Sequence, residues 1–169
     1  MFRIGQGYDV HRFAPEGTLV VGGVEVSREI GVVAHSDGDV LLHALCDALL
    51  GAIAAGDIGA WFPDTDPLWR GADSGALLAT VVDHLHGRGY RVVNVDSTVI
   101  AQVPRMAPHV AAIRERVAQL LQVPVDAVAV KATTSEGLGF VGRREGIAAQ
   151  AVALVTSAAV DPERPRDGG

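Results

Sequence analysis

The fold is predicted most directly from residues 36–55, SDGDVLLHALCDALLGAIAA. Ser36, followed three residues later by Asp39, resembles a capping box, in which a hydroxyl caps a helix and an acid supports its first turn. We therefore expect a helix that begins at Ser36 and runs to about Ala54. An apolar stripe that can face a core is formed by Leu42, Leu45, Cys46 and Leu49. A polar stripe on the same helix is formed by Asp39, His43 and Asp47, spaced i, i+4 and i+8.

A second stretch, GYDVH at residues 7–11, places Asp9 and His11 one residue apart. Alternate side chains of a strand point to the same face, so this carboxylate and imidazole lie together if the segment is extended. His43 offers a third ligand, and two nitrogens with one oxygen leave a fourth position open. That set is typical of a catalytic rather than a structural zinc site.

The metal interpretation competes with plainer ones. An Asp-x-His pattern is common by chance, and His43 among leucines is by default a core histidine. The carboxylates of Asp39 and Asp47 shift the balance toward a metal site, because an acid one turn away can orient a ligating imidazole.

Composition limits the classes of function. The 169 residues are enough for one domain with its own core, and the 49% hydrophobic, 5% aromatic content favours aliphatic layers. A net charge of −6 argues against nucleic acid or an anionic membrane as partner. Cys46 is the only cysteine, which excludes a disulfide framework and a thiolate zinc site. The first residues lack a signal-peptide pattern and no apolar run approaches the ~20 residues that cross a bilayer, so we expect a cytoplasmic protein.

Turn residues and periodicity divide the rest of the chain. Further helices are expected from Asp73 or Ser74 to Gly87, and from Pro108 onward. The expected strands are Phe2–His11, Thr18–Val26, Arg91–Ala101 (with Val93, Val95, Val99 and Ala101 on one side), Val128–Ala132 and Gly146–Thr156.

This order predicts an α+β two-layer sandwich, a mixed four- to five-stranded sheet with helices on one face. The other face would be bare, and Gln150 with the alanines around it indicates that this face meets other subunits. We expect a single domain over residues 1–160 and a disordered tail over residues 161–169.

Two loops are rich in polar residues. In KATTSEGLGFVGR, residues 131–143, hydroxyls and glycine N–H groups can cradle phosphate, and Glu136 can hold a divalent cation. The alternative, a flexible polar turn with a solvated acid, stays equally open from these residues alone. In GDIGAWFPDTD, residues 56–66, acids and aromatic rings exceed what a connection needs, although a solvated turn region is the plainer interpretation.

Taken in order, these stretches resemble the 2-C-methyl-D-erythritol 2,4-cyclodiphosphate synthase family. The resemblance extends from about Arg3 to Thr156. It rests on DVH at residues 9–11, AHSDGD at 34–39, GDIG at 56–59, FPDTD at 62–66 and the segment 131–143. It implies a homotrimer with its sheets around the trimer axis and active sites between adjacent subunits. It also implies a phosphorus–oxygen lyase of the non-mevalonate isoprenoid pathway, which closes a cyclic diphosphate on a cytidine diphosphate substrate and releases CMP.

The resemblance implies a role for each matched position. One zinc ion per subunit would be held by Asp9, His11 and His43, and a magnesium or manganese ion, bound with the substrate, by Glu136. His35 and Thr134 would stabilise the transition state. The residues expected to contact substrate are Asp9, Val10, His11, His35 and Ser36; Asp57, Ile58 and Gly59; Phe62, Pro63, Asp64, Thr65 and Asp66; Ala101, Gln102, Val103, Pro104, Arg105, Met106 and Ala107; Thr133, Thr134, Ser135 and Glu136; and Phe140 and Arg143.

Some positions depart from the family pattern. Arg105 and Gly137 stand for common lysines, Gln6 for a frequent histidine, and Val141 for a threonine. Gln150 replaces an acid of the trimer channel, which leaves open whether Arg143 serves a regulatory prenyl-diphosphate site.

Two other classes of function remain open. A zinc hydrolase or nucleotide deaminase would need a carboxylate base beside a metal-bound water. A trimeric nucleotide-binding regulator would bind cytidine nucleotides without turnover, and would not need Asp9, His11 and His43 together.

Overall fold

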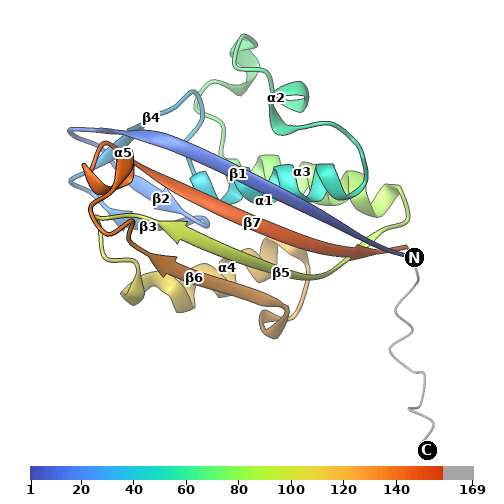
Figure 1. Ribbon diagram of the computed structural model, residues 1–169. Helices are drawn as coiled ribbons and strands as arrows, with labels where there is room; N and C mark the ends of the chain where they lie inside the picture. The colour runs from blue at the N-terminus through green and yellow to red at the C-terminus, as the bar shows by residue number, and fades with distance from the viewer. Residues whose placement is uncertain (158–169) are drawn as a thin grey trace, which may run out of the picture.

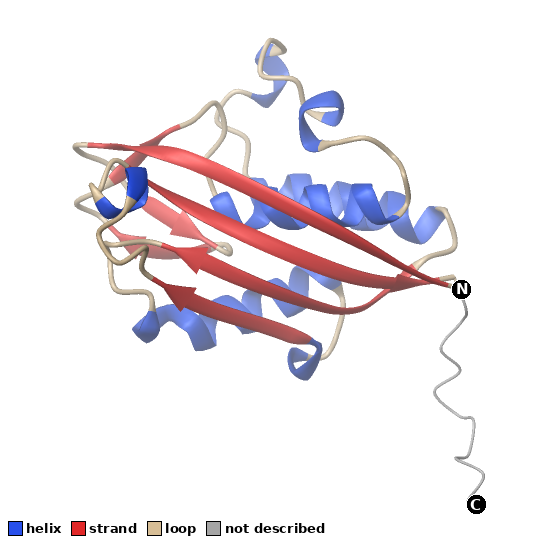
Figure 2. Ribbon diagram, viewed as in Figure 1, coloured by secondary structure: helices blue, strands red, loops and turns tan. Residues whose placement is uncertain are grey.

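The computed structural model describes residues 1–157 of the chain. The tail predicted over residues 161–169 lies outside the described residues, and the single domain over residues 1–160 stays a prediction. The elements, coloured by type in Figure 2, are β1 (Phe2–Ala14), β2 (Leu19–Val21), β3 (Val24–Ser27), β4 (Gly31–Val33), α1 (Val40–Ala52), α2 (Ile58–Trp61), the 3₁₀ turn η1 (Pro67–Trp69), α3 (Ser74–Gly87), β5 (Arg91–Ile100), the 3₁₀ turn η2 (Ala107–His109), α4 (Val110–Leu121), the 3₁₀ turn η3 (Val125–Ala127), β6 (Val128–Thr133), α5 (Gly139–Gly142) and β7 (Gly146–Thr156).

The main sheet of the described residues has five strands in the order β4-β1-β7-β5-β6. β1 and β7 pair antiparallel along their length, from Phe2 opposite Thr156 to Arg12 opposite Gly146. β5 pairs antiparallel with β7 and parallel with β6, so the sheet is mixed. Helices α1, α3 and α4 all lie behind this sheet in the view of Figure 1. The predicted α+β two-layer sandwich, with helices on one face of a mixed sheet, is confirmed.

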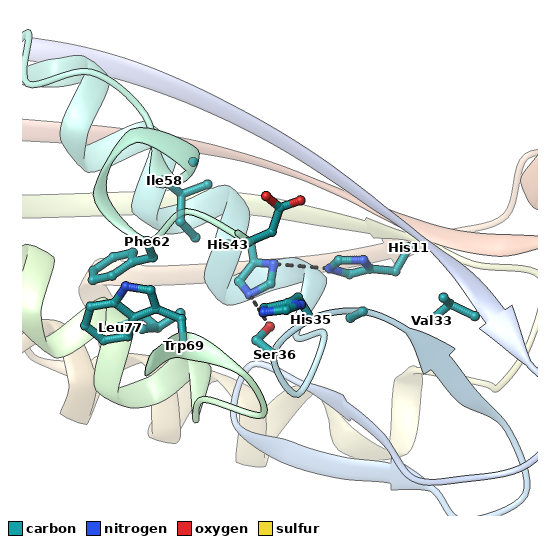
Figure 3. Close-up of a pocket in the computed structure, with 12 residues that line it drawn as sticks. His11, Val33, His35, Ser36, His43, Ile58, Phe62, Trp69 and Leu77 are labelled. Carbon is teal, nitrogen blue, oxygen red and sulfur yellow. Dashed lines mark hydrogen bonds between the residues drawn. The ribbon is translucent and has the colours of Figure 1, made fainter. Parts of the chain in front are cut away.

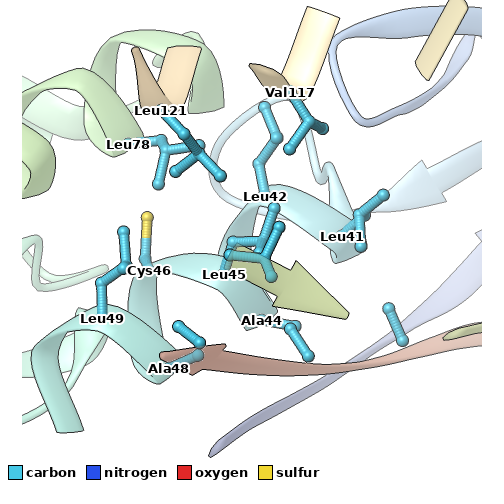
Figure 4. Packing of buried hydrophobic residues seen from close by; sticks show 14 of the residues in the cluster. Leu41, Leu42, Ala44, Leu45, Cys46, Ala48, Leu49, Leu78, Val117 and Leu121 are labelled. Atoms are coloured by element: carbon cyan, nitrogen blue, oxygen red, sulfur yellow. The ribbon is translucent and has the colours of Figure 1, made fainter. Parts of the chain in front are cut away.

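The hydrophobic core lies between the sheet and the helices, with α1 at its centre. Figure 4 shows the predicted stripe of Leu42, Leu45, Cys46 and Leu49 facing Leu78 of α3 and Leu121 of α4. Each of these six side chains is fully shielded from solvent. Burying such a side chain contributes about 1.5–3 kcal/mol, so α1 is held mainly by its apolar packing.

Two glycines let α1 approach β1 unusually closely. A Cβ atom at Gly5 would lie 1.9 Å from the carbonyl oxygen of Ala48, and one at Gly7 would lie 1.9 Å from that of Ala44. Because any side chain would collide with the helix backbone, glycine is required at both positions. The same face of β1 continues to Asp9 and His11, so this close approach sets how far those side chains lie from α1.

The opposite face of the sheet is covered by none of the long helices. Its exposed residues include Ile4, Tyr8 and Val10 on β1 and Gln150 and Val152 on β7. Of the β7 alanines, Ala148 lies on this face, where it lines a hollow with Tyr8 and Gln150, but the other three do not, contrary to the prediction. Ala149, Ala151 and Ala153 are buried and occupy the positions that face α1, where small side chains admit the helix.

Three sequence predictions about elements are wrong in detail. Residues 18–26 form two short strands of a separate hairpin, because Gly22 and Gly23 both adopt positive φ (62° and 74°) and turn the chain between β2 and β3. In β5 the register shifts between Val92 and Asn94, so Val92 rather than Val93 is buried on the core side. The helix expected from Pro108 begins at Val110, after the 3₁₀ turn η2.

Other predictions hold. Asp73 caps α3 by accepting a hydrogen bond from the N–H of Gly75, and β7 spans Gly146–Thr156 as predicted. Among residues 1–157, every helix is too short or too polar to cross a lipid bilayer.

Candidate functional site

Two neighbouring elements bring the three predicted metal ligands together. Asp9 and His11 lie on the α1-facing side of β1, and His43 lies in the first turn of α1. The Oδ2 atom of Asp9 lies 3.0 Å from His11 Nε2 and 3.0 Å from His43 Nδ1. The two imidazole nitrogens are 3.1 Å apart (Figure 3). Within the described residues, these side chains are the one group of three or more metal-ligating residues whose ligand atoms lie within 4.8 Å of one another.

The Asp9 carboxylate is held in its ionised form, which suits the binding of a cation. Burial raises the pKa of Asp9, but hydrogen bonds from His11 and His43 and their charges outweigh burial and hold that pKa well below its ordinary value. The side chains of Asp9, His11 and His43 are 25%, 15% and 11% exposed, so the ligand atoms are sheltered but reachable. Two nitrogens and a carboxylate oxygen at one point fit a divalent metal ion of the zinc type, with room for a further ligand.

The second nitrogen of His43 is held by hydroxyls, not by carboxylates. His43 Nε2 lies 2.8 Å from Ser74 Oγ and 3.2 Å from Ser36 Oγ. The prediction that Asp39 or Asp47 orients this ring is wrong, because both carboxylates are bonded elsewhere. Ser74 was expected only at the start of a helix, and no pattern within the sequence places its side chain against His43.

Asp39, not Ser36, caps α1. Its carboxylate accepts hydrogen bonds from the N–H groups of Leu41 and Leu42 in the first turn, and from those of Gly22 and Gly23 in the β2–β3 turn. Asp39 is completely buried, and this burial raises its pKa to about 6 in spite of the four donors. The cap therefore lies three residues later than predicted, and Ser36 stays free to face His43.

Asp47 connects α1 to the loop that follows it. Its carboxylate accepts a hydrogen bond of 2.8 Å from the N–H of Ile58, the first residue of α2. Burial raises its pKa, and the charges of Asp57 and Asp9 act in the same direction. The i+4 position after His43 thus anchors the 56–66 loop over the pocket instead of orienting the ring.

His11 and His43 line a pocket with an apolar wall (Figure 3). Phe62 and Trp69 form part of this wall, in an edge-to-face contact of 5.0 Å between ring centroids. The lining residues that the sequence predicted are His11, His35, Ser36, His43, Ile58, Gly59, Phe62 and Asp64. Those that it missed are Val33, Ala34, Trp69 and Leu77. Among these missed residues, only Trp69 could have been suspected from the sequence, because it is an aromatic residue just after the acidic loop.

Four predicted residues of the 56–66 loop do not line this pocket. Asp57 caps α2 through the N–H of Ala60, and Asp66 caps η1 through the N–H of Leu68. Pro63 and Thr65 also lie outside the lining. The carboxylates of Asp57 and Asp66 therefore act as helix caps in this chain.

His35 carries an unsatisfied polar atom at the pocket. Its Nε2 atom is buried and has no hydrogen-bond partner among the described residues. A buried polar group without a partner costs about 1–3 kcal/mol. The backbone of this segment is fixed, because the carbonyl of His35 accepts from Gly71 N–H and the N–H of Asp37 donates to Ala72. A bound polar group would satisfy the Nε2 atom.

A second pocket lies at the far edge of the sheet, beyond β5 and β6. It is lined by the predicted residues Ala101, Gln102, Pro104, Arg105, Met106, Ala107, Thr133, Thr134 and Glu136, and by Ala132. Gln102 joins its two segments by accepting from the N–H of Ser135 at 3.3 Å. Thr134 donates to Glu136 at 3.0 Å, and Glu136 adopts a left-handed φ of 53°. No residue lines both pockets.

Six predicted residues lie outside the lining of both pockets without belonging to the acidic loop. Asp9 is one of them, with its carboxylate in contact with His11 and His43. Val10 is exposed on the bare sheet face, and Val103 and Ser135 adjoin the second pocket without lining it. Phe140 lines a separate hollow on the bare face. Arg143 forms an exposed ion pair with Glu145 at 2.9 Å. Within a single chain, the predicted contact residues therefore do not all line one pocket.

Comparison with known proteins identifies the family. The YgbB family model matches residues 2–156. This chain belongs to the YgbB family. Among YgbB relatives, it is 62% identical over 156 residues to the 2-C-methyl-D-erythritol 2,4-cyclodiphosphate synthase of Ectopseudomonas mendocina, covering 92% of this chain and 99% of that protein. It is 56% identical over 155 residues to the synthase of the same name from Bacillus cereus, covering 92% and 98%.

Solved structures agree with the YgbB assignment. A 2C-methyl-D-erythritol-2,4-cyclodiphosphate synthase in a CDP-bound form is similar with a TM-score of 0.84 and 37% identity, over 91% of this chain and 100% of that one. The bifunctional IspDF of Campylobacter jejuni is similar with a TM-score of 0.89 and 40% identity, over 92% of this chain and 42% of that one.

Proposed function

We propose that this chain converts 4-diphosphocytidyl-2-C-methyl-D-erythritol 2-phosphate to 2-C-methyl-D-erythritol 2,4-cyclodiphosphate and CMP, a step of the non-mevalonate route to isoprenoids. The observation that carries the proposal is the convergence of Asp9, His11 and His43 at one point, beside a pocket that His11 and His43 line. The names of relatives up to 62% identical over nearly their whole length agree with it. The reaction class is a phosphorus–oxygen lyase, because an intramolecular phosphate displaces CMP without water.

Asp9, His11 and His43 would hold one zinc ion per subunit. A bound zinc ion supplies Lewis-acid polarisation of a phosphate oxygen and a fixed point for its orientation. The chain's own contribution is to keep Asp9 ionised and to aim both imidazoles at the carboxylate. The choice of zinc follows from the nitrogen-rich donor set and the absence of thiolates, since Cys46 is buried in the core.

His35 and Ser36 would bind the substrate's phosphates. The unpartnered Nε2 atom of His35 can donate to a phosphate oxygen, which removes the cost of leaving it unsatisfied. Ser36 lies in the same pocket, with its hydroxyl beside His43. The apolar wall of Phe62 and Trp69 would receive the methylerythritol carbon skeleton and exclude water from the reacting phosphates.

The second pocket would bind the cytidine diphosphate part of the substrate. Thr133 and Thr134 offer hydroxyls, and Glu136 offers a carboxylate. Glu136 would hold a magnesium or manganese ion, which would neutralise phosphate charge when bound with the substrate. Such an ion needs phosphate oxygens as additional ligands, because Glu136 belongs to no metal-ligating cluster within residues 1–157. Thr134 would stabilise the transition state together with His35.

The chemistry needs orientation more than acid–base catalysis. An oxygen of the 2-phosphate attacks the β phosphorus, a new P–O bond forms, and the bond from that phosphorus to the bridging oxygen of CMP breaks. The attacking oxygen is already ionised, so no side chain has to remove a proton. Holding a tethered nucleophile in line is worth about 7–11 kcal/mol, and the pocket residues supply that alignment.

We further propose a homotrimer whose active sites lie between adjacent subunits. Two features support it: the uncovered sheet face exposes Ile4, Tyr8, Val10 and Val152, and the two pockets share no lining residue. A substrate that needs both pockets can bind to both at once if the first pocket of one subunit faces the second pocket of its neighbour.

Two measurements test the trimer. Light scattering should give three times the 17.6 kDa chain mass. Co-expressed H43A and T134A chains, each inactive alone, should regain about a quarter of wild-type activity, because one site in four of a random mixed trimer combines two intact halves. A monomer, or mixed chains as inactive as the parents, would contradict the shared site.

The proposed location is the cytoplasm. The one cysteine is buried in the core and reduced, so no disulfide calls for an oxidising compartment.

The function is tested by incubating the purified protein with the phosphorylated cytidyl substrate and following phosphorus resonances. We expect one cyclic diphosphate per CMP released, and no activity from the H43A variant. In ¹⁸O-labelled water neither product should carry the label. A linear, labelled product would indicate a zinc hydrolase instead, and tight binding of cytidine nucleotides without turnover would indicate a regulator.

A further inference from the structure

The side chain of His43 is connected to Ser74 and Asp37 by a chain of hydrogen bonds that the metal site does not itself explain. His43 Nε2 lies 2.8 Å from Ser74 Oγ, and Ser74 Oγ donates to Asp37 Oδ1 in a short hydrogen bond. Ser74 is completely buried. The other oxygen of Asp37 accepts from the backbone N–H of Ser74 at 3.0 Å.

The direction of these bonds decides which nitrogen of His43 carries the proton. Its Nδ1 atom faces Asp9 and His11, so a metal ion at that point requires an unprotonated Nδ1. The ring proton must then sit on Nε2, which faces Ser74. A serine hydroxyl has one proton to donate, and Ser74 donates it to the carboxylate of Asp37. Ser74 therefore accepts from His43 and cannot donate to it.

Asp37 is held firmly enough to set this direction. It lies at the N-terminus of α3, where its carboxylate accepts from the N–H of Ser74, the first residue of the helix, and faces the positive end of the helix dipole. Its own N–H donates to the carbonyl of Ala72, and Asp39 N–H donates to its Oδ1 atom. Ser36 is a weaker partner for His43, because its hydroxyl lies 3.2 Å away and already accepts from Gly38 N–H.

We infer that Ser74 and Asp37 are positioning residues for the metal site, which fix His43 with its proton on Nε2 and Nδ1 free to bind the ion. The inference rests on the proposed zinc site. Groups that orient a ligating histidine in this way typically change metal affinity by about 10- to 100-fold when they are removed.

The test measures zinc affinity without substrate, by competition with a chromophoric chelator on the intact protein. S74A should bind zinc about 10- to 100-fold more weakly than wild type, S36A should lose less, and S74T, which keeps the hydroxyl, should recover most of the affinity. S97A is the matched control, since Ser97 is also buried and donates one hydrogen bond, which goes to the carbonyl of Ala129 on β6 and not to a proposed metal ligand. Its zinc affinity should stay within about twofold of wild type.

Two further readouts separate positioning from mere folding. In the zinc-loaded protein, the Nε2 proton of His43 should give a slowly exchanging resonance that moves upfield in D37N and stays in place in S97A. Saturating zinc should restore most of the kcat of S74A with little change in KM, because Ser74 acts through His43 and not on substrate.

The outcomes are distinguishable. If wild type binds no zinc through Asp9, His11 and His43, the proposed metal site and this inference fall together. If wild type binds zinc and S74A binds it equally well, only the inference is wrong. The same holds if D37N leaves the His43 resonance unchanged.

Discussion

The two pockets of this chain are built in opposite ways. The first is rigid by construction: Asp9, His11 and His43 lie on the longest strand and the most deeply buried helix, at a distance set by Gly5 and Gly7. The second consists of the loops around residues 101–107 and 132–136, whose polar residues Thr133, Thr134 and Glu136 are exposed. Under the proposed function, this difference would correspond to two tasks: the core would hold the reacting phosphorus, and the surface loops would bind the leaving nucleotide.

The first pocket should not tolerate loss of a ligand. We expect H43A to lose zinc and to lower CMP release at least about 1,000-fold, or ~4 kcal/mol, because Asp9 and His11 alone leave only two of the three clustered ligands. The fold should persist, since the core around α1 is formed by its leucines. Metal analysis, circular dichroism and a CMP assay measure the three effects. Full turnover by the metal-free variant would refute the assignment.

The close approach of β1 and α1 should be just as sensitive. G7A places a methyl group against the carbonyl of Ala44, so we expect a loss of at least about 3 kcal/mol in the free energy of unfolding and weaker zinc binding. G5A is the matched control: the clash with Ala48 is equal, but it lies two residues further from Asp9. G5A should lose similar stability and less zinc affinity. Equal zinc affinity in G7A and wild type would show that the helix position does not control the site.

The cap of α1 predicts a pH dependence of stability. Burial raises the pKa of Asp39 from 3.8 to about 6, so the folded state holds this proton more tightly than the unfolded chain. Its contribution is fully present below about pH 4 and is lost as pH rises through about 6, by up to ~3 kcal/mol. D39N should be less stable and should lack this component between pH 4 and 6 in urea unfolding. Parallel curves for the two proteins would contradict the buried carboxylate.

The second pocket should be the more tolerant one. E136Q keeps the shape of an exposed side chain, so we expect unchanged stability and zinc content, and a loss of about tenfold in activity (~1.4 kcal/mol), partly recovered at high magnesium. A magnesium titration of CMP release measures this effect. An unchanged titration would remove Glu136 from the site.

Patterns between residues that are close in the sequence predicted the candidate metal ligands. The features that were missed depend on contacts between residues that are distant in the sequence. Asp9 and His11 follow from strand alternation, and His43 follows from the helix pattern. Ser74 is 31 residues from His43, and only the packing of α3 on α1 brings the two together. The helix start was misplaced because Ser36 and Asp39 both suit a cap, and the choice depends on two N–H groups of a distant hairpin.

Some of the missed features did leave a signal. The Gly22-Gly23 pair between valines is a typical hairpin turn, which would have divided the segment predicted as one strand. The bulge at Val93 left none, since every residue around it suits a strand. One chain also cannot show how the two pockets combine into one site, because in the proposed trimer that depends on how the copies meet at the bare sheet face.

The central claim is that Asp9, His11 and His43 bind one metal ion. Anomalous diffraction at the zinc edge, on crystals of the zinc-loaded protein, tests it most directly. The account predicts one strong peak per chain, within bonding distance of Asp9 Oδ2, His11 Nε2 and His43 Nδ1, and its disappearance in H43A. A fully loaded crystal with the zinc peak elsewhere, and those three atoms still hydrogen-bonded to one another, would contradict it.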